Sequence, residues 1–317
     1  MRRFDVTIAG ELNLDLILYG LPEQFAPERE LLAENMMLTL GGSSAIVAHN
    51  LAALGVKVGF ASCVGDDSLG RIALDRLRNG GVDVSQVRVK SDNSRTGLTV
   101  ILQHQHWRNM LTYPGTIFGL TFQDLDLSYI ADARHFHLSS FFLQRGLQQS
   151  VPELLQKLKT AGVTVSLDPN DDPEDRWDGN LREALRYVDV FLPNAREAQK
   201  IAGTNDVKKA IQCLAESVPV VVVKLGSEGA MAQRGDELVT CPAFKVTAFD
   251  AVGAGDSFDA GFLSQYLRGA ELRACLEFAN LAGAFSTTRP GGTEAFRDRE
   301  YRDEFFRTRT LSAKQNL

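Results

Sequence analysis

The sequence contains few of the features that mark secreted, zinc-binding or membrane proteins. Its 317 residues include four cysteines that lie far apart and form no CxxC pair, so neither a disulfide framework nor a zinc site is indicated. No stretch approaches the roughly 20 apolar residues of a membrane-spanning helix. Asp5, Glu11 and Asp15 interrupt the apolar start of the chain before a signal-peptide core is complete. We therefore expect a cytoplasmic protein with reduced thiols and no membrane partner.

Basic residues are in the minority. The chain has 34 Lys and Arg against 40 Asp and Glu, a formal charge of -6 at pH 7, and no run of basic residues that could form a stripe. Nucleic acid is therefore not expected as a partner. With 44% hydrophobic residues the chain can bury a large core, and we expect one domain over residues 1–317.

Several common catalytic motifs are also missing. The sequence has no GxxxxGK[ST] motif, and its first predicted strand is followed by a single glycine, Gly10, instead of GxGxxG. No GxSxG nucleophile elbow occurs either. These absences argue against a P-loop enzyme, a nicotinamide-dependent oxidoreductase and a serine hydrolase.

Short β-branched or aliphatic runs alternate with helical patterns along the chain. The runs lie at residues 4–9, 56–61, 163–167, 188–192 and 218–224. Such alternation indicates βαβ units around a mainly parallel sheet. The last run is apolar on both faces, as a central strand covered on each side should be.

Two helices can be delimited by their end signals. Ser150 and Glu153 have the spacing of an N-terminal capping box, and Gly162 has the position of a helix end. A second helix is predicted from about residue 256 to residue 268, with Phe258 and Phe262 on its apolar face.

Two segments, residues 14–40 and 94–116, interrupt the alternation. Their short apolar runs alternate with polar residues, a pattern typical of antiparallel strands. We expect them to form a small β-sheet lid over one end of the main sheet. Because exposed strand edges can pair with another chain, a homodimer through the lid is also expected.

The most informative stretch of the sequence runs from residue 249 to residue 261, FDAVGAGDSFDAG. Gly253, Ala254 and Gly255 precede a helix, so that free backbone NH groups at the positive end of the helix dipole could receive an anion. Asp256, in the first helical turn, could accept the proton of an attacking hydroxyl. The same pattern also fits a plain helix cap, so the function needs further support.

That support comes from a resemblance. Asp250, the run from Gly253 to Asp256, and Phe258 resemble the DTxGAGDxF signature of the ribokinase-like (PfkB) carbohydrate kinase family, with Ala251 in place of the usual Thr. The resemblance implies a ribokinase-like three-layer α/β sandwich with a mainly parallel central sheet and a β-sheet lid. It further implies a kinase that uses ATP and Mg²⁺, with Asp256 as the base. Near Asp250 it implies a monovalent-cation site for K⁺ or Na⁺.

The resemblance also implies a set of substrate-binding residues near the start of the chain. Asn13 and Asp15 match the strand end that grips sugar hydroxyls in the family, and Gly41 and Gly42 match its glycine pair. Where the family usually has Asn, this chain has Ile46, with Asn50 one helical turn later as a substitute and an altered substrate pocket as the consequence.

Asp168 and Asn170, followed by Arg176 and Trp177, resemble the DxNxRxxxW pattern of fructokinases and 2-keto-3-deoxygluconate kinases, with stretched spacing. We therefore expect a small sugar or sugar acid as the substrate. A nucleoside kinase of the same fold and a non-catalytic sugar- or nucleotide-sensing homologue remain open as alternatives.

On the nucleotide side, Asn194 and Glu197 match the family's NxxE motif. The resemblance implies that Glu197 orients water on Mg²⁺ and that Asn194 approaches the phosphates and the metal, although the same spacing is an ordinary capping box. The other nucleotide-binding residues that it implies lie in a GxxG turn and in the closing segment: Lys224, Gly226, Gly229, Asn280 and Gly291.

The histidine pairs His104/His106 and His135/His137 each have i, i+2 spacing, which places both members on one face of a strand. Two such pairs could bind zinc, but no neighbouring Cys or carboxylate completes either set. We interpret them as strand histidines.

Overall fold

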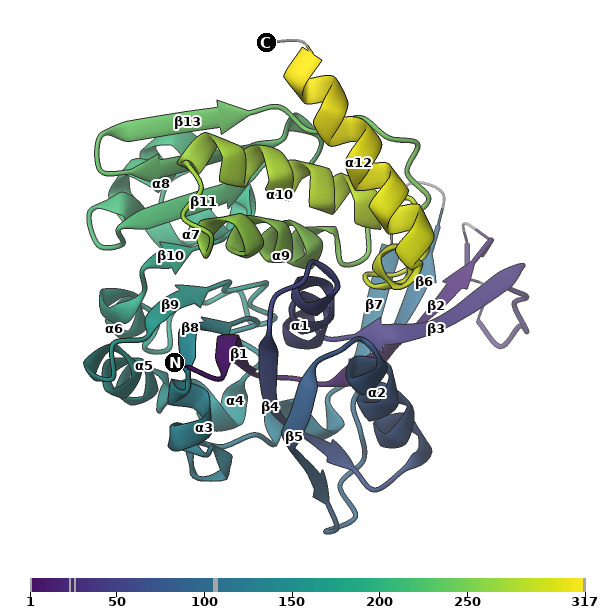
Figure 1. The fold of residues 1–317 in the computed structure, drawn as a ribbon. Coiled ribbons are helices and arrows are strands. Elements are labelled where there is room, and N and C mark those ends of the chain that lie inside the picture. Colours follow the sequence, from purple (N-terminus) through teal and green to yellow (C-terminus); the bar gives the residue numbers. More distant parts are fainter. Residues whose placement is uncertain (1, 23, 26, 105–107, 316–317) are drawn as a thin grey trace.

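The computed structural model describes residues 2–315 apart from residues 23, 26 and 105–107. Within this part of the chain the largest element is a nine-stranded sheet with the order β13-β12-β11-β10-β9-β8-β1-β4-β5 (Figure 1). Its strands are β1 (Phe4–Ala9), β4 (Val58–Gly65), β5 (Asp83–Lys90), β8 (Ala133–Leu138), β9 (Thr164–Leu167), β10 (Val190–Phe191), β11 (Val220–Lys224), β12 (Ala230–Arg234) and β13 (Glu237–Cys241). The pairs from β5 to β11 are parallel, and β12 and β13 join antiparallel at one edge. The mainly parallel sheet is therefore confirmed.

Helices cover both faces of this sheet. The α-helices of the described residues are α1 (Ser43–Ala53), α2 (Ser68–Asn79), α3 (Leu127–Ala131), α4 (Arg145–Gln148), α5 (Val151–Thr160), α6 (Leu181–Ala184), α7 (Ala195–Ala202), α8 (Val207–Ala215), α9 (Ala254–Tyr266), α10 (Leu272–Ser286), α11 (Glu294–Arg297) and α12 (Arg299–Gln315), of which α11 and α12 pack with the end of α10. Short 3₁₀ turns lie at Gly115–Phe118, Phe122–Asp124, Leu185–Tyr187 and Gly226–Glu228. None of the described helices has the length and apolarity needed to cross a bilayer.

The two largest clusters of buried apolar residues lie one on each face of the large sheet. Val221 and Val223 of β11 pack with residues of α3 to α8, whereas Val220 and Val222 of the same strand pack with residues of α1, α2, α9 and α10. Because successive side chains of a strand point to opposite faces, a strand that is apolar throughout must be covered on both. The three-layer sandwich expected from the sequence is confirmed.

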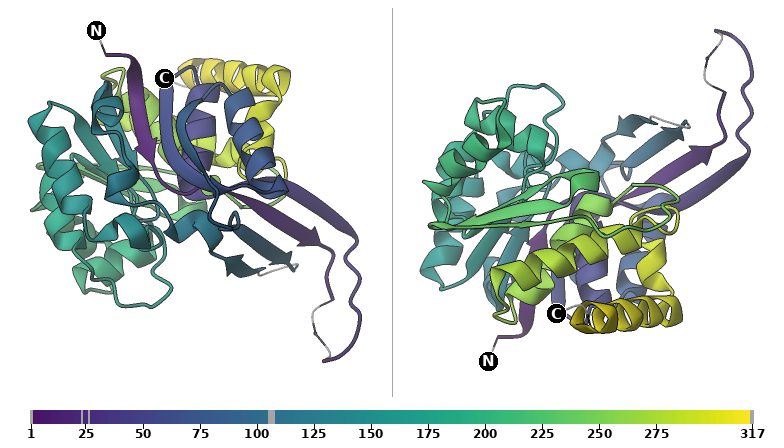
Figure 2. Two further views of the ribbon diagram at one scale, coloured as in Figure 1. Left: turned by 90° about the horizontal axis from the view of Figure 1, so that it is seen from below. Right: turned by 90° about the horizontal axis from the view of Figure 1, so that it is seen from above.

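A second, smaller sheet has the strand order β3-β2-β6-β7. It consists of β2 (Asn13–Tyr19), β3 (Asn35–Gly41), β6 (Leu98–Gln103) and β7 (Arg108–Tyr113). Figure 2 shows it projecting from the main body. The small separate sheet was predicted correctly; two of its strand pairs are antiparallel, and β2 and β6 are parallel. In the chain, β2 follows β1 and β6 follows β5. Because β1 and β5 run in the same direction in the large sheet, β2 and β6 also run in the same direction in the small sheet.

Two details of the predicted helices also needed correction. Helix α9 begins at Ala254 and ends at Tyr266, with Gly253 as its N-cap residue. The capping box at Ser150 does not form, because the Ser150 side chain makes no capping hydrogen bond. Gly162 does follow the end of α5, with φ of 71°.

All four cysteines are free, and three of them are buried.

Candidate active site

The start of α9 forms a narrow turn beside the loop that contains Gly292. Gly253 has φ of 71°, and a Cβ atom added there would overlap the Cα atom of Gly292, so glycine is required on both steric and conformational grounds. Ala254 and Gly255 follow as the first helical residues, and Asp256 lies in the first turn, only 8% exposed. The predicted combination of glycine-flanked NH groups and a carboxylate is therefore present at one helix terminus.

Asp256 is surrounded by other polar groups. Burial, and next the charge of Asp168, raise its pKa to about 6, although a hydrogen bond from the Ser43 side chain and the ammonium of Lys224 act in the opposite direction. Glu11 contributes a further increase. A carboxylate whose pKa lies close to neutral pH is well suited to accept a proton in catalysis.

The substrate-side residues Asn13, Asp15, Gly41 and Gly42 lie together where β2 and β3 pair. Asn13 is opposite Gly41 in the register, and a Cβ atom on Gly42 would come within 2.6 Å of Asn13 Oδ1. That buried oxygen has no hydrogen-bond partner among the described residues. A buried acceptor without a donor is costly, so it fits a ligand hydroxyl.

Asp15 faces the same space as Asp256. Burial, and next the charge of Asp256, raise the pKa of Asp15 to about 8, whereas a hydrogen bond from Thr99 lowers it and Glu11 raises it. The effect of the Asp256 charge on the pKa of Asp15 indicates that a carboxyl group of the small sheet and one of α9 lie close enough to interact. An acceptor bound between them would contact both.

Asn50 has a different environment from the one its predicted role requires. Its Nδ2 donates to Ser257 Oγ at 2.9 Å and to the Gly292 carbonyl at 3.0 Å, and the side chain is fully buried. Asn50 therefore ties α1 to α9 and to the Gly292 loop, and we do not retain it as a substrate ligand. Ile46 packs beside it, within 3.4 Å of a Cβ atom placed on Gly253.

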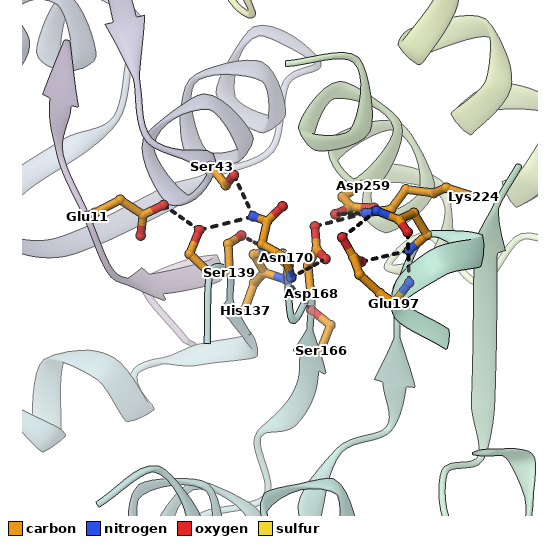
Figure 3. Close-up of polar contacts among 12 residues, drawn as sticks. Glu11, Ser43, His137, Ser139, Ser166, Asp168, Asn170, Glu197, Lys224 and Asp259 are labelled. Atoms are coloured by element: carbon orange, nitrogen blue, oxygen red, sulfur yellow. Dashed lines mark hydrogen bonds and ion pairs between the residues drawn. The ribbon is translucent and has the colours of Figure 1, made fainter. Parts of the chain in front are cut away.

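A buried cluster of charges lies at the carboxyl ends of β9 and β11 (Figure 3). Lys224 Nζ is 2.8 Å from Asp168 Oδ2 and 3.1 Å from Asp259 Oδ2, and both carboxylates are almost completely buried. Burial raises the pKa of Asp259 well above its ordinary value. Burial acts in the same direction on Asp168, but Lys224 and several hydrogen bonds outweigh it and keep that pKa below the ordinary value. Asp168 therefore carries the negative charge that faces Lys224.

Lys224 also borders the predicted anion site. A Cβ atom on Gly255 would lie 3.8 Å from Lys224 Nζ, which places the ammonium beside the turn at the start of α9. Its two carboxylate partners hold it there. Asp259 was not predicted as part of this site, and it lies one residue beyond the recognised signature.

Asn194 and Glu197 form the capping box that their spacing predicts. Asn194 is the N-cap residue of α7, its Oδ1 accepts from the Glu197 NH group at 3.0 Å, and Glu197 Oε2 accepts from the Asn194 NH group at 2.8 Å. Burial, and next the charge of Asp168, raise the pKa of Glu197 to about 7. A hard divalent cation that prefers oxygen ligands and retains water fits this environment. Among the described residues, no three His, Cys, Asp or Glu side chains are grouped as ligands for a metal ion.

The predicted nucleotide-side turn connects β11 to β12. Its φ angles of 60° at Gly226 and 103° at Gly229 favour glycine, and a Cβ atom on Gly229 would overlap the Cys241 carbonyl. Nothing lies within 4 Å of a Cβ atom on Gly226, so this side of the turn is open. Asn280 Nδ2 donates to the carbonyls of Cys241 and Pro242 at 3.2 and 3.1 Å, and therefore fixes the chain where it leaves β13.

Asp250 connects three segments of the chain. Its Oδ2 accepts from the Tyr19 hydroxyl at 2.6 Å and from the Gly291 NH group at 3.1 Å, and its Oδ1 accepts from the Val252 NH group at 2.9 Å. This carboxylate holds the small sheet, the turn before α9 and the Gly291 loop together.

Sequence reasoning did not identify two further polar residues, Glu11 and Ser43. The Glu11 carboxylate is buried and accepts from Ser44 Oγ at 2.7 Å and from Ser140 Oγ at 2.8 Å, which joins the end of β1 to α1 and to the segment after β8. Burial raises the pKa of Glu11. Because its partners lie 33 and 129 residues away, no local pattern could reveal them.

The histidines of β8 form a buried chain of hydrogen bonds with serine and threonine hydroxyls. His135 contacts Thr164 Oγ1 at 2.8 Å and Ser166 Oγ at 2.7 Å, and His137 contacts Ser166 Oγ and Ser139 Oγ at 2.7 Å each. These residues are strand histidines, as interpreted from the sequence. His106 lies outside the described residues.

Burial lowers the pKa of His135 to about 3 and that of His137 to about 4, which predicts a loss of stability in acid. A histidine whose pKa is lowered by folding stays neutral in the folded state while the unfolded chain takes up a proton below its ordinary pKa of about 6.5. Between pH 7 and pH 4.5 each histidine should therefore reduce the free energy of unfolding by about 2.5 kcal/mol. Urea unfolding at the two pH values measures this loss. His137→Gln should show a shallower pH dependence than the wild-type chain, and an equal slope would contradict the assignment.

Comparisons with known proteins agree with this geometry. The model of the pfkB family carbohydrate kinases matches residues 3–299, so the chain belongs to that family. It is accordingly a carbohydrate kinase, a phosphotransferase with an alcohol group as acceptor.

Two relatives and one solved structure show the range of the similarity. The chain is 32% identical to an ATP-dependent ribose-1-phosphate kinase of Halopiger xanaduensis over 294 residues, covering 92% of this chain and 94% of the other. It is 29% identical to a 2-dehydro-3-deoxygluconokinase of Bacillus subtilis over 276 residues, covering 82% and 84%. An E. coli protein provisionally described as ribokinase II, solved with ATP and Mg²⁺, has a TM-score of 0.83 at 25% identity, covering 96% and 99%.

Proposed function

We propose that the protein transfers the γ-phosphoryl group of ATP to a hydroxyl of a small sugar or sugar acid, with Asp256 as the catalytic base. The observation that carries the proposal is the buried Asp256 carboxylate at the glycine-flanked start of α9, opposite Asp15 of the small sheet. A hydroxyl held by Asn13 and Asp15 would lie between the base and the NH groups of Gly253, Ala254 and Gly255. Those NH groups would stabilise the charge that develops during transfer.

ATP and Mg²⁺ belong to this proposal. The open side of the Gly226–Gly229 turn, the Gly291 loop and the region of Asn280 would hold the nucleotide, while Lys224 beside Gly255 would face its phosphates. Asn194 and Glu197 would bind Mg²⁺ through water. When bound, the cation would supply positive charge to the phosphate oxygens. Closure of the small sheet over the acceptor would exclude water and limit hydrolysis of ATP.

The charges of the site favour an uncharged acceptor. Glu11, Asp15 and Asp256 place carboxyl groups on the substrate side, and an anionic acceptor would have to compete with Asp168 and Asp259 for the nearby ammonium of Lys224, which is already paired. A neutral sugar is therefore the first choice and a sugar acid the second. A nucleoside acceptor is the alternative that remains.

An acceptor panel tests the function. ADP release would be followed with D-fructose, D-ribose, 2-dehydro-3-deoxygluconate, ribose 1-phosphate and adenosine, each with and without Mg²⁺. We expect release that depends on both acceptor and Mg²⁺, with the highest kcat/KM for an uncharged sugar. Absence of acceptor-dependent ADP release would contradict the proposed transfer to these acceptors, and a preference for adenosine would favour a nucleoside kinase.

The same assay in K⁺, Na⁺ or tetramethylammonium buffers tests a monovalent cation near Asp250. Because the Asp250 carboxylate already accepts three hydrogen bonds, backbone carbonyls of its turn would supply most ligands for that ion. Equal rates in all three buffers would argue against such an ion.

A homodimer through the small sheet is a further part of the proposal. Large apolar side chains are exposed on its strands, among them Met36 and Met110, both 60% exposed, and Leu111, 58% exposed. Pairing of two such sheets would cover them. Sedimentation equilibrium of the full chain checks the oligomeric state.

We also place the protein in the cytoplasm, because four free cysteines suit a reducing compartment.

A further inference from the structure

Strand β2 carries four consecutive alternate residues on one face: Asn13, Asp15, Ile17 and Tyr19. The pairing of β2 with β3 is regular over this whole length, so residues two apart point to the same side of the small sheet. Asn13 and Asp15 are the proposed acceptor ligands. Ile17 and Tyr19 continue the same face and contact the turn that precedes α9. One strand face therefore reaches both the acceptor and the proposed anion site.

The first of these contacts is apolar. Ile17 and Ile101 pack against Val252 in a buried cluster in which no member is more than 6% exposed. Ile101 lies opposite Ile17 in the register of β2 and β6, so two strands of the small sheet take part. Val252 immediately precedes Gly253, the N-cap residue of α9. The small sheet is thus packed directly on the turn that presents the NH groups.

The second contact is polar and directional. The Tyr19 hydroxyl donates to Asp250 Oδ2 at 2.6 Å, and its ring packs edge-on against the ring of Phe249, with the centroids 5.4 Å apart. The same carboxylate accepts from the NH groups of Val252 at 2.9 Å and Gly291 at 3.1 Å. Hydrogen bonds to a carboxylate are short and strong. Through Asp250, Tyr19 therefore fixes both the turn before α9 and the Gly291 loop.

We propose that Tyr19 is a positioning residue: through Asp250 it holds residues 250–253 so that the NH groups at the start of α9 face the phosphoryl group during transfer. This inference rests on the proposed function and deepens it. The strand that binds the acceptor also orders the site that receives the developing charge. Because that charge is largest in the transition state, the contribution of Tyr19 belongs to kcat and not to acceptor binding.

Amide hydrogen exchange of the full chain, followed by NMR, tests the proposal without any acceptor. In Tyr19→Phe, which keeps the ring and removes the hydroxyl, the NH groups of Val252 and Gly291 should exchange about tenfold faster, because their acceptor Asp250 loses a strong hydrogen bond. The amides of β6 should exchange as in the wild-type chain, which shows that the small sheet stays folded. Tyr113→Phe is the matched control, since Tyr113 ends β7 of the same sheet and is 55% exposed, and it should change neither set.

ADP release with the best acceptor of the panel provides a second measurement. In Tyr19→Phe kcat should fall about tenfold, because displaced NH groups stabilise the developing charge less well. KM for the acceptor should stay within about twofold of the wild-type value, since Asn13 and Asp15 are unchanged. A merely structural role, in which the small sheet is loosened, would raise the acceptor KM instead. Tyr113→Phe should leave both constants unchanged.

A double-mutant cycle shows whether Tyr19 acts through Asp250. Asp250→Asn removes the charge that the hydroxyl contacts, so adding Tyr19→Phe to it should lower kcat by less than about twofold more. A loss in the double variant equal to the product of the two single losses would mean that Tyr19 acts independently of Asp250.

Unchanged exchange of Val252 and Gly291 in Tyr19→Phe would overturn the proposal, as would a raised acceptor KM with an unchanged kcat. Failure of the proposed function is a separate result. It would appear as ADP release that does not depend on an acceptor, or as an active Asp256→Asn variant, whereas the exchange rates show independently whether Tyr19 orders the turn.

Discussion

Replacing Asp256 by Asn should lower kcat by a factor of about 10² to 10⁴, the usual contribution of a general base. The amide has nearly the same shape as the carboxylate but cannot take a proton from the attacking hydroxyl. KM for ATP should change little, because the Gly226–Gly229 turn and the Gly291 loop remain intact. ADP release at saturating acceptor, together with circular dichroism of the variant, measures the effect.

The same variant should be as stable as the wild-type chain or more stable. Asp256 is buried and faces the carboxylates of Asp15, Asp168 and Glu11, so its ionised form is costly in the folded state. Active sites commonly keep such groups at the expense of stability. Thermal unfolding checks this expectation.

Asp206→Asn is the control for the Asp256 variant. Asp206 is the N-cap residue of α8, and its exposed carboxylate accepts from two NH groups of the first turn. Asn caps a helix about equally well, so this substitution should change neither activity nor stability. If Asp256→Asn kept a kcat close to that of the wild-type chain, Asp256 could not be the base.

Local patterns predicted the elements that local interactions stabilise. The apolar run of β11 and the capping box of Asn194 and Glu197 depend on neighbouring residues, and both formed as expected. The capping box of Ser150 and Glu153 failed for a reason that also lies nearby. Because α4 ends only at Gln148, Ser150 has φ of -99° and ψ of 0°, whereas an N-cap residue that bonds through its side chain needs an extended backbone.

The site was predictable only as far as its motifs extend. Asp256 and the glycines before it follow from the sequence, because helix termini bind anions by a general mechanism. The partners of Asn50 and Asn170 do not, since Ser257 and Ser43 are brought to them by the packing of α1, α9 and the end of β9. A polar residue in a recognised motif therefore has a predictable place, while its hydrogen bonds depend on distant segments.

Replacing Lys224 by Met should destabilise the protein by about 3 to 5 kcal/mol at pH 7, which is the range found when one partner of a buried ion pair is removed. Lys224 is the cation that contacts the buried carboxylates of Asp168 and Asp259, at 2.8 and 3.1 Å. Without it, the charge of Asp168 has no compensating partner in a medium of low dielectric constant. Urea unfolding at pH 7 measures the loss.

Two further variants separate the loss of charge pairing from the loss of packing. Lys157→Met removes an exposed lysine that pairs with Glu153 at 3.4 Å on the surface of α5, and it should cost less than about 1 kcal/mol. Adding Asp168→Asn to Lys224→Met removes the uncompensated charge and should restore at least half of the lost stability. If the double variant were no more stable than Lys224→Met, lost packing of the lysine stem, and not an unpaired carboxylate, would account for the destabilisation.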